Sequence, residues 1–124
     1  MIRVLVADDH PIVRGGIVAL LNSADDLTVV GEASTGLEAV ALAIELEPDL
    51  VLMDLQMPEL GGAEATARIL DQRPAMRVIV LTTYASDSAI LTAIEAGASG
   101  YLLKAAPSSE ILAGIRSVAA GDVA

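Results

Sequence analysis

Five polar side chains that could act together in one reaction each close a short apolar run of the sequence. Asp8 and Asp9 close the first run, and Asp54 closes the third. Thr82 and Lys104 close the fourth and the fifth. Clustered carboxylates repel one another unless a cation is present, and Mg²⁺ prefers oxygen ligands. An aspartate beside Mg²⁺ and a lysine can attack a phosphoryl donor, so these residue types predict phosphoryl transfer to a carboxylate.

Each of these residues also has an ordinary structural explanation when it stands alone. An aspartate at a strand end is usually a cap or a turn former, and a threonine suits a strand. His10 stands beside the first two aspartates like a metal ligand, but Mg²⁺ prefers oxygen and the residue before Pro11 has a restricted backbone. We therefore expect His10 to be an exposed loop residue. The aspartates, the threonine and the lysine favour a site only because they occur together.

The elements that must position these residues alternate along the chain. Near-continuous apolar runs predict strands covered on both faces, at residues 2–7, 27–33, 50–53, 78–81 and 101–103. Stretches with helical periodicity separate the runs, and one follows the last run. Strands that alternate with helices predict a parallel sheet with helices on both faces. Ligands bind outside the carboxyl ends of such strands, which is where the polar residues lie.

The helical stretches also predict which side chains face the sheet. Pro11 suits a first helical position, residues 62–72 form the third helix, and Gly97 ends the fourth, which residues 86–88 can cap. The expected apolar faces are Val13, Ile17, Leu20 and Leu21; Leu37, Val40, Ala41 and Ile44; Ala63, Ala67, Ile69 and Leu70; Ile90 and Ile94; and Ile111, Ile115 and Val118.

The composition favours one acidic domain that binds neither nucleic acid nor lipid by itself. The chain has 124 residues, which suits one domain, and 54% of them are hydrophobic, which is enough for a core. It has no Cys, which excludes disulfides and thiolate metal sites. Its formal net charge of −10 repels nucleic acid and anionic lipid. No apolar stretch resembles a signal sequence or a membrane span, so we expect a soluble, cytoplasmic protein.

Four stretches together identify a family resemblance along essentially the whole chain. In this order and at these spacings, the chain resembles the receiver domain of bacterial two-component response regulators. The first and last stretches further resemble the NarL/LuxR-type branch, whose members usually carry a C-terminal helix-turn-helix domain. The matching stretches are Val6-Ala7-Asp8-Asp9-His10-Pro11, residues 49–58 (DLVLMDLQMP), Val80-Leu81-Thr82 and residues 97–104 (GASGYLLK).

The resemblance implies a fold and a set of partners. It implies a flavodoxin-like (βα)5 domain over residues 1–124 with strand order 2-1-3-4-5. The implied donor is a sensor histidine kinase, and a homodimer is expected. DNA would be bound only through a C-terminal output domain in the parent protein. The domain would catalyse only its own phosphorylation and dephosphorylation, so we do not expect an enzyme with turnover.

The resemblance also assigns roles to individual residues. Asp54 would be the phospho-acceptor, Asp9 would bind Mg²⁺ directly and Asp8 would act largely through water. The backbone carbonyl of Gln56 would be a further ligand beside Asp54.

A second group of residues would respond to the phosphoryl group. Thr82 would turn toward it, Tyr101 would follow Thr82 inward, and Lys104 would pair with a phosphoryl oxygen. Gln56 and Tyr84 lie two residues after Asp54 and Thr82, where they would influence the lifetime of the phosphorylated state.

The sequence departs from the receiver-domain pattern at two places, and three alternative functions remain open. Ala105 stands where many receiver domains have Pro, and Gly61-Gly62 occupies a loop that we expect to be more mobile than usual. A phosphatase of the haloacid dehalogenase type would carry a second Asp where Gln56 stands. A nucleotide-binding module would carry a glycine-rich phosphate motif, which the sequence lacks. A stand-alone receiver that acts as an adaptor or relay is the remaining alternative.

Overall fold

Strands and helices alternate along the chain as the apolar pattern predicts. The structure, a computed structural model, describes residues 1–83 and 87–121, apart from the side chains of residues 87 and 89. The strands are β1 (Ile2–Ala7), β2 (Leu27–Ala33), β3 (Leu50–Asp54), β4 (Arg77–Thr82) and β5 (Gly100–Leu103). The helices are α1 (Pro11–Asn22), α2 (Gly36–Leu46), α3 (Gly62–Gln72), α4 (Asp87–Glu95) and α5 (Ser108–Ala119). Each predicted strand is confirmed.

The strands form one parallel sheet in the order β2-β1-β3-β4-β5. This confirms the expected flavodoxin-like fold and its strand order. Strand β3 lies at the centre and is buried along its whole length. Because all strands run in the same direction, their carboxyl ends meet at one edge of the sheet. The polar residues that close the apolar runs are therefore brought to a common edge.

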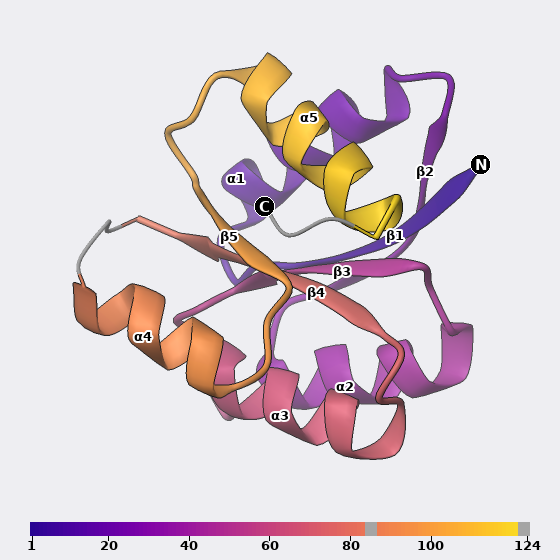
Figure 1. Cartoon of the computed structure of the whole chain (residues 1–124). Coiled ribbons are helices and arrows are strands. Elements are labelled where there is room, and N and C mark those ends of the chain that lie inside the picture. The colour runs from indigo at the N-terminus through magenta and orange to yellow at the C-terminus, as the bar shows by residue number, and fades with distance from the viewer. Residues whose placement is uncertain (84–86, 122–124) are drawn as a thin grey trace.

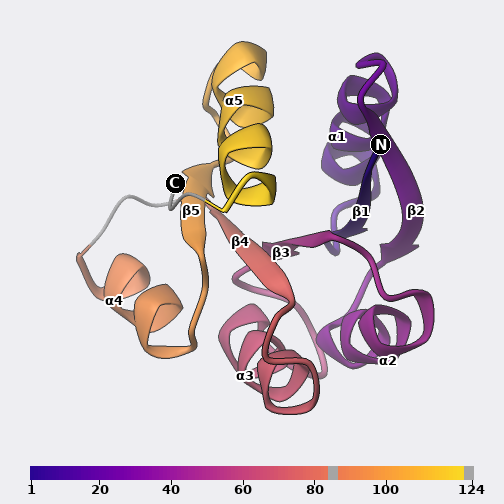
Figure 2. The same ribbon diagram turned by 45° about the vertical axis from the view of Figure 1, so that its right-hand side comes forward.

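Helices cover both faces of the sheet. Helices α1 and α5 lie on one face, and α2, α3 and α4 lie on the other (Figures 1 and 2). Successive side chains of a strand point to opposite faces, so each strand serves two cores. Val4 and Val6 of β1 pack with residues of α1 and α5, whereas Leu5 and Ala7 pack with residues of α2 and α3. This explains why the strands read as continuous apolar runs.

The predicted face of α2 is partly wrong: Val40 packs against the core and Ile44 is half-buried, but the other two predicted residues are exposed. Leu37 is 45% exposed and Ala41 is also exposed, whereas Gly36, Ala39 and Ala43 are buried. A Cβ atom on Gly36 would lie 1.9 Å from the carbonyl oxygen of Leu60, so the helix begins in close contact with the loop before α3. The fully buried positions of this helix are all small residues, which a pattern of large apolar side chains does not single out.

The structure corrects part of the predicted apolar faces of α1, α3 and α4. Ile17 and Leu21 of α1 are buried, but Val13 is 39% exposed and Leu20 is half-buried. Helix α3 buries Ile69 as predicted, together with Ala65 and Thr66, while Ala67 is exposed and Ala63 and Leu70 are half-buried. Ile94 of α4 is 64% exposed, whereas Ala93 is buried. The face of α5 is confirmed, with Ile111, Ile115 and Val118 buried.

Helix α4 ends where the glycine signal predicted. Gly97 follows α4 with φ +95°, a left-handed conformation that glycine adopts without strain, so its predicted role at the helix end is confirmed. Ser86, the first residue of the predicted cap, lies outside the described residues.

Within residues 1–83 and 87–121, no helix is long and apolar enough to cross a membrane.

Candidate functional site

Backbone hydrogen bonds of the sheet continue past the strand ends and hold the site residues. The N–H of Asp8 donates to the Ala33 carbonyl oxygen at 2.9 Å. The N–H of Lys104 donates to the Thr82 carbonyl oxygen at 2.9 Å. Asp54 is itself the last residue of β3. The functional side chains therefore start from a rigid edge, although most of them lie in loops.

Three aspartates and a lysine meet at this edge. Asp8 is fully buried, Asp54 is 3% exposed and Asp9 is half-buried. Ligand atoms of Asp8, Asp9, His10 and Asp54 all lie within 4.8 Å of one another. The Lys104 Nζ lies 3.2 Å from Asp8 Oδ2 and 3.0 Å from Asp54 Oδ2. The structure thus brings together the charged groups that the sequence placed at separate strand ends.

The charges in this cluster are only partly balanced. Burial raises the pKa of Asp54 above its ordinary value, and the charge of Asp8 adds to this, while Lys104 acts in the opposite direction. Burial acts to lower the pKa of Lys104, but its contacts with Asp54 and Asp8 outweigh burial and raise that pKa. Lys104 therefore stays protonated, whereas Asp54 resists ionisation when no further cation is present.

Three buried carboxylate oxygens of the cluster fit a hard divalent cation. Asp8 Oδ2, Asp9 Oδ1 and Asp54 Oδ2 are buried and receive no hydrogen bond from the described residues. Lys104 lies within ion-pair distance of two of these oxygens. An all-carboxylate set of oxygens suits Mg²⁺ better than it suits a soft metal.

His10 lies closer to the carboxylates than the sequence suggested. Its side chain is 64% exposed, which agrees with the expected loop position. Its Nδ1 nevertheless lies 3.1 Å from Asp9 Oδ1 and 3.4 Å from Asp8 Oδ1, and its backbone N–H donates to Asp8 Oδ1 at 2.8 Å. The turn after β1 is thus folded back on its own acidic side chains.

A small cavity of about 50 Å³ opens beside Asp54. Its lining includes Thr82 from β4 and Lys104 from the loop after β5. Gln56 also lines it, and the Gln56 N–H donates to Asp54 Oδ1 at 3.3 Å. The sequence analysis missed Thr83, a further lining residue whose only signal was its place directly after Thr82.

The remaining predicted residues lie farther from the cluster or outside the described residues. Tyr101 is half-buried in β5, opposite Val80 of β4. Tyr84 lies outside the described residues, so the structure places only Gln56 of the predicted pair. Among the described residues no peptide bond is cis, and the Lys104–Ala105 bond is therefore trans.

Two supporting residues were missed or misread in the sequence. Gly62 begins α3, and a Cβ atom there would lie 2.0 Å from the carbonyl oxygen of Asp54. Its role is to let the helix approach the end of β3, which the expected loop mobility did not suggest. Arg14 of α1 donates from Nη1 to the Asp8 carbonyl oxygen at 2.7 Å. Its signal was a basic residue close to the acidic turn.

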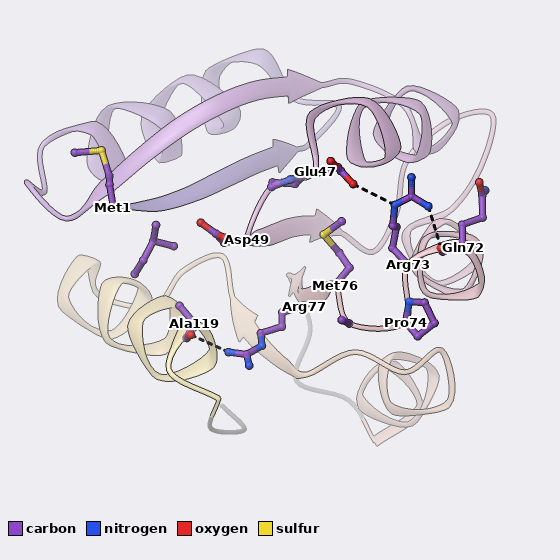
Figure 3. A pocket seen from close by; sticks show the side chains of 12 residues that line it. Met1, Glu47, Asp49, Gln72, Arg73, Pro74, Met76, Arg77 and Ala119 are labelled. Atoms are coloured by element: carbon purple, nitrogen blue, oxygen red, sulfur yellow. Dashed lines mark hydrogen bonds and ion pairs between the residues drawn. The ribbon is translucent and has the colours of Figure 1, made fainter.

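A larger hollow of about 690 Å³ lies at the opposite edge of the sheet, around the amino ends of β1, β3 and β4 (Figure 3). Its charged groups are already engaged within the protein. Arg73 pairs with Glu47 at 3.6 Å, and Arg77 donates to the carbonyl oxygens of Val118 and Ala119. The chemical groups converge instead at the small cavity beside Asp54.

Comparisons with known proteins agree with this geometry. Residues 4–116 match the family model of the response regulator receiver domain. The chain is 47% identical over 122 residues to the transcriptional regulatory protein LiaR of Bacillus subtilis. That match covers 98% of the chain and 58% of LiaR. The chain is also 46% identical over 122 residues to the response regulator GacA of Pseudomonas aeruginosa. This second match covers 98% of the chain and 57% of GacA.

Solved structures are similar as well. A two-component response regulator of the LuxR family from Aurantimonas sp. SI85-9A1 matches with a TM-score of 0.95 and 39% identity. That match covers 99% of the chain and 88% of the other protein. The chain spans a little over half of the length of the two sequence relatives named above.

Proposed function

The chain belongs to the response regulator receiver domain family, in its NarL/LuxR-type branch, and on this basis we propose that Asp54 accepts a phosphoryl group. Receiver domains of this family act in two-component signalling. One observation carries the choice of Asp54 among the three aspartates. The small cavity is lined by Asp54, Thr82 and Lys104 but not by Asp8 or Asp9. A phosphoryl group in that cavity would therefore meet the Asp54 carboxylate.

The transfer itself is a single displacement at phosphorus. An Asp54 carboxylate oxygen attacks, and the new P–O bond forms as the bond to the donor breaks. The electron pair leaves with the donor, which is the imidazole of a phosphohistidine or the carboxylate of an acyl phosphate. Lys104, which lies 3.0 Å from Asp54 Oδ2, would pair with a phosphoryl oxygen and hold its charge in place.

Mg²⁺ completes the proposed site. Asp8, Asp9 and Asp54 would hold it through carboxylate oxygens, and Gln56 through its backbone carbonyl. When bound, Mg²⁺ offsets negative charge on the transferring oxygens. Three buried carboxylate oxygens without hydrogen bonds from described residues support this assignment.

The proposed switch couples the phosphoryl group to the surface around α4 and β5. Phosphorylation adds roughly −1.5 to −2 charge and three acceptor oxygens. The Thr82 hydroxyl would turn toward these oxygens, and Tyr101 would move inward behind it. Of the described α4 side chains, only Ala93 is buried, so a shift of this helix disturbs little packing.

Output and partners follow from the longer relatives. We propose that the parent protein carries a C-terminal helix-turn-helix domain and that phosphorylation controls its binding to DNA as a homodimer. The proposed donor is a sensor histidine kinase. The name of LiaR as a transcriptional regulator, and the 58% of LiaR that the chain covers, support an output domain.

The lifetime of the phosphorylated state depends on groups that can position water. Gln56 lines the cavity, and an amide is not a strong general base. We propose a lifetime of minutes or longer. Loss of the acyl phosphate within seconds, measured after removal of the donor, would contradict this.

Labelling with acetyl phosphate tests the function. The purified chain should take up phosphate in the presence of Mg²⁺, as a bond that hydroxylamine cleaves, and a chelator should prevent uptake. Asp54→Asn should abolish uptake. Asp71→Asn makes the same change on the exposed part of α3 and should label like the wild type. Equal labelling of Asp54→Asn and the wild type would overturn the assignment.

A further inference from the structure

The Arg14 side chain connects three elements beside the acidic turn. It leaves α1 and donates from Nη1 to the Asp8 carbonyl oxygen at 2.7 Å, just past the end of β1. Its Nε donates to Glu32 Oε1 of β2 at 3.1 Å. The Arg14 side chain is 20% exposed, so it is held within the structure rather than extended into solvent. The proposed phosphoryl transfer gives this side chain no role.

The group that Arg14 holds is the peptide between Asp8 and Asp9. The carbonyl oxygen of Asp8 and the N–H of Asp9 lie in one peptide plane, so fixing the oxygen fixes where the Asp9 backbone leaves the turn. The rest of the turn is already bound, because the Asp8 N–H donates to Ala33 and the Asp8 carboxylate accepts from the His10 N–H. The Arg14 contact is what orients the plane that leads to Asp9.

We propose that Arg14 is a positioning residue for Mg²⁺, with Glu32 holding Arg14 in place. This inference rests on the proposed function, in which Asp9 and Asp8 hold the ion. Groups that orient metal ligands typically contribute about 10-fold to 100-fold to metal affinity. A planar guanidinium suits this task, since its donors are rigidly spaced and can bind two partners at once.

An effect of the Arg14 charge alone would change Mg²⁺ affinity in the opposite direction to a loss of positioning. A positive charge close to the carboxylates repels a cation, so removing it would strengthen Mg²⁺ binding. Loss of positioning would weaken Mg²⁺ binding instead. The sign of the change in affinity upon Arg14→Gln therefore separates the two effects.

Calorimetric titration with MgCl₂ on the purified chain tests the proposal without any phosphoryl donor. Arg14→Gln should weaken Mg²⁺ binding about 10-fold or more. Arg14→Lys should also weaken it, because an ammonium keeps the charge but lacks the rigid fork. Arg68→Gln removes an arginine that pairs with Glu64 at 3.4 Å on α3, and it should leave the affinity unchanged.

The outcomes that overturn the proposal are distinct. Tighter binding in Arg14→Gln with wild-type binding in Arg14→Lys would show an effect of charge alone. Wild-type affinity in both variants, with only a lower thermal midpoint, would show a role in folding alone. Either result would contradict a positioning role for Arg14.

Changes at Glu32 test the same contact without altering α1. Glu32→Ala should weaken Mg²⁺ binding because Arg14 loses its anchor. Glu32→Gln keeps an acceptor and should stay close to the wild type. Since the Glu32 side chain is 49% exposed, both variants should fold even if Arg14→Gln does not. Unchanged affinity in a folded Glu32→Ala would overturn the role of Glu32 and of its pair with Arg14.

The proposed function can fail separately. If the wild type binds Mg²⁺ but does not take up phosphate at Asp54, the signalling assignment falls while the Arg14 result still stands. If the wild type binds no Mg²⁺, both proposals fall. If it binds Mg²⁺ and is labelled, but Arg14 and Glu32 variants match it throughout, only the Arg14 proposal falls.

Discussion

Asp54 at the end of the central strand β3 and Lys104 just past the edge strand β5 form an ion pair, with Lys104 Nζ 3.0 Å from Asp54 Oδ2. The same nitrogen lies 3.2 Å from Asp8 Oδ2, so one cation bridges the carboxyl ends of β1, β3 and β5. Lys104 is the only lysine of the chain. Lys104 therefore balances part of the acidic charge of Asp8 and Asp54 before any metal binds.

Replacing Lys104 should slow phosphorylation strongly. We expect Lys104→Met to lower the rate of labelling by acetyl phosphate about 100-fold, because removing one charged donor from a phosphoryl site has an effect of this order. Lys104→Arg should restore part of the rate. The measurement is the initial rate of labelling at saturating Mg²⁺. A rate for Lys104→Met within a factor of about two of the wild type would argue against the assigned role.

Asp54 should lower the stability of the metal-free protein at neutral pH. Burial raises the pKa of Asp54, so the carboxyl binds its proton more tightly in the folded than in the unfolded chain. The resulting penalty is absent at a pH below the ordinary Asp value and complete above the raised one. Asp54→Asn should therefore raise the thermal midpoint at neutral pH and change it little in acid.

Thermal unfolding without Mg²⁺ at the two pH values checks this expectation. Asp71→Asn, on an exposed position of α3, serves as the control for loss of one carboxylate. A lower midpoint for Asp54→Asn at neutral pH would show that the Lys104 contact outweighs burial.

Mg²⁺ should stabilise the folded chain through the acidic cluster. A ligand that binds only the folded state adds about 2.7 kcal/mol to the free energy of unfolding when its concentration is 100 times its dissociation constant. Asp9→Asn should remove most of this effect, because Asp9 Oδ1 is one of the three buried oxygens without hydrogen bonds from described residues. Denaturant unfolding at several MgCl₂ concentrations measures it. Equal stabilisation of Asp9→Asn and the wild type would place the ion elsewhere.

Two glycines should respond in opposite ways to alanine. A Cβ atom on Gly62 would lie 2.0 Å from the Asp54 carbonyl oxygen, so Gly62→Ala must displace α3 or the end of β3. We expect a loss of about 1–3 kcal/mol in the free energy of unfolding, as for other overpacked sites, together with slower labelling of Asp54.

Gly15 provides the matched substitution. It lies inside α1, and a Cβ atom there would meet nothing within 4 Å. Gly15→Ala should stabilise the chain by about 0.5–1 kcal/mol, because alanine favours a helix interior over glycine. Denaturant unfolding of both variants decides the matter, and a Gly62→Ala protein as stable as the wild type would refute the steric argument.

The sequence by itself determined the order of the elements and the residues at the strand ends. Apolar runs and helical periodicity are local properties, so the strands and the bounds of α3 could be predicted to within a residue. A parallel sheet then brings its carboxyl ends to one edge, which was enough to expect Asp8, Asp54 and Lys104 in one place.

The tertiary structure alone decided the faces of the helices and the contacts within the site. Helix α2 buries Gly36, Ala39 and Ala43, and at Gly36 the carbonyl of Leu60 lies too close to leave room for a side chain. Contacts such as Arg14 with the Asp8 carbonyl and Glu32 depend on how α1 packs against β1 and β2. Such contacts join segments that are separate in the sequence, and no local pattern records the distance between them.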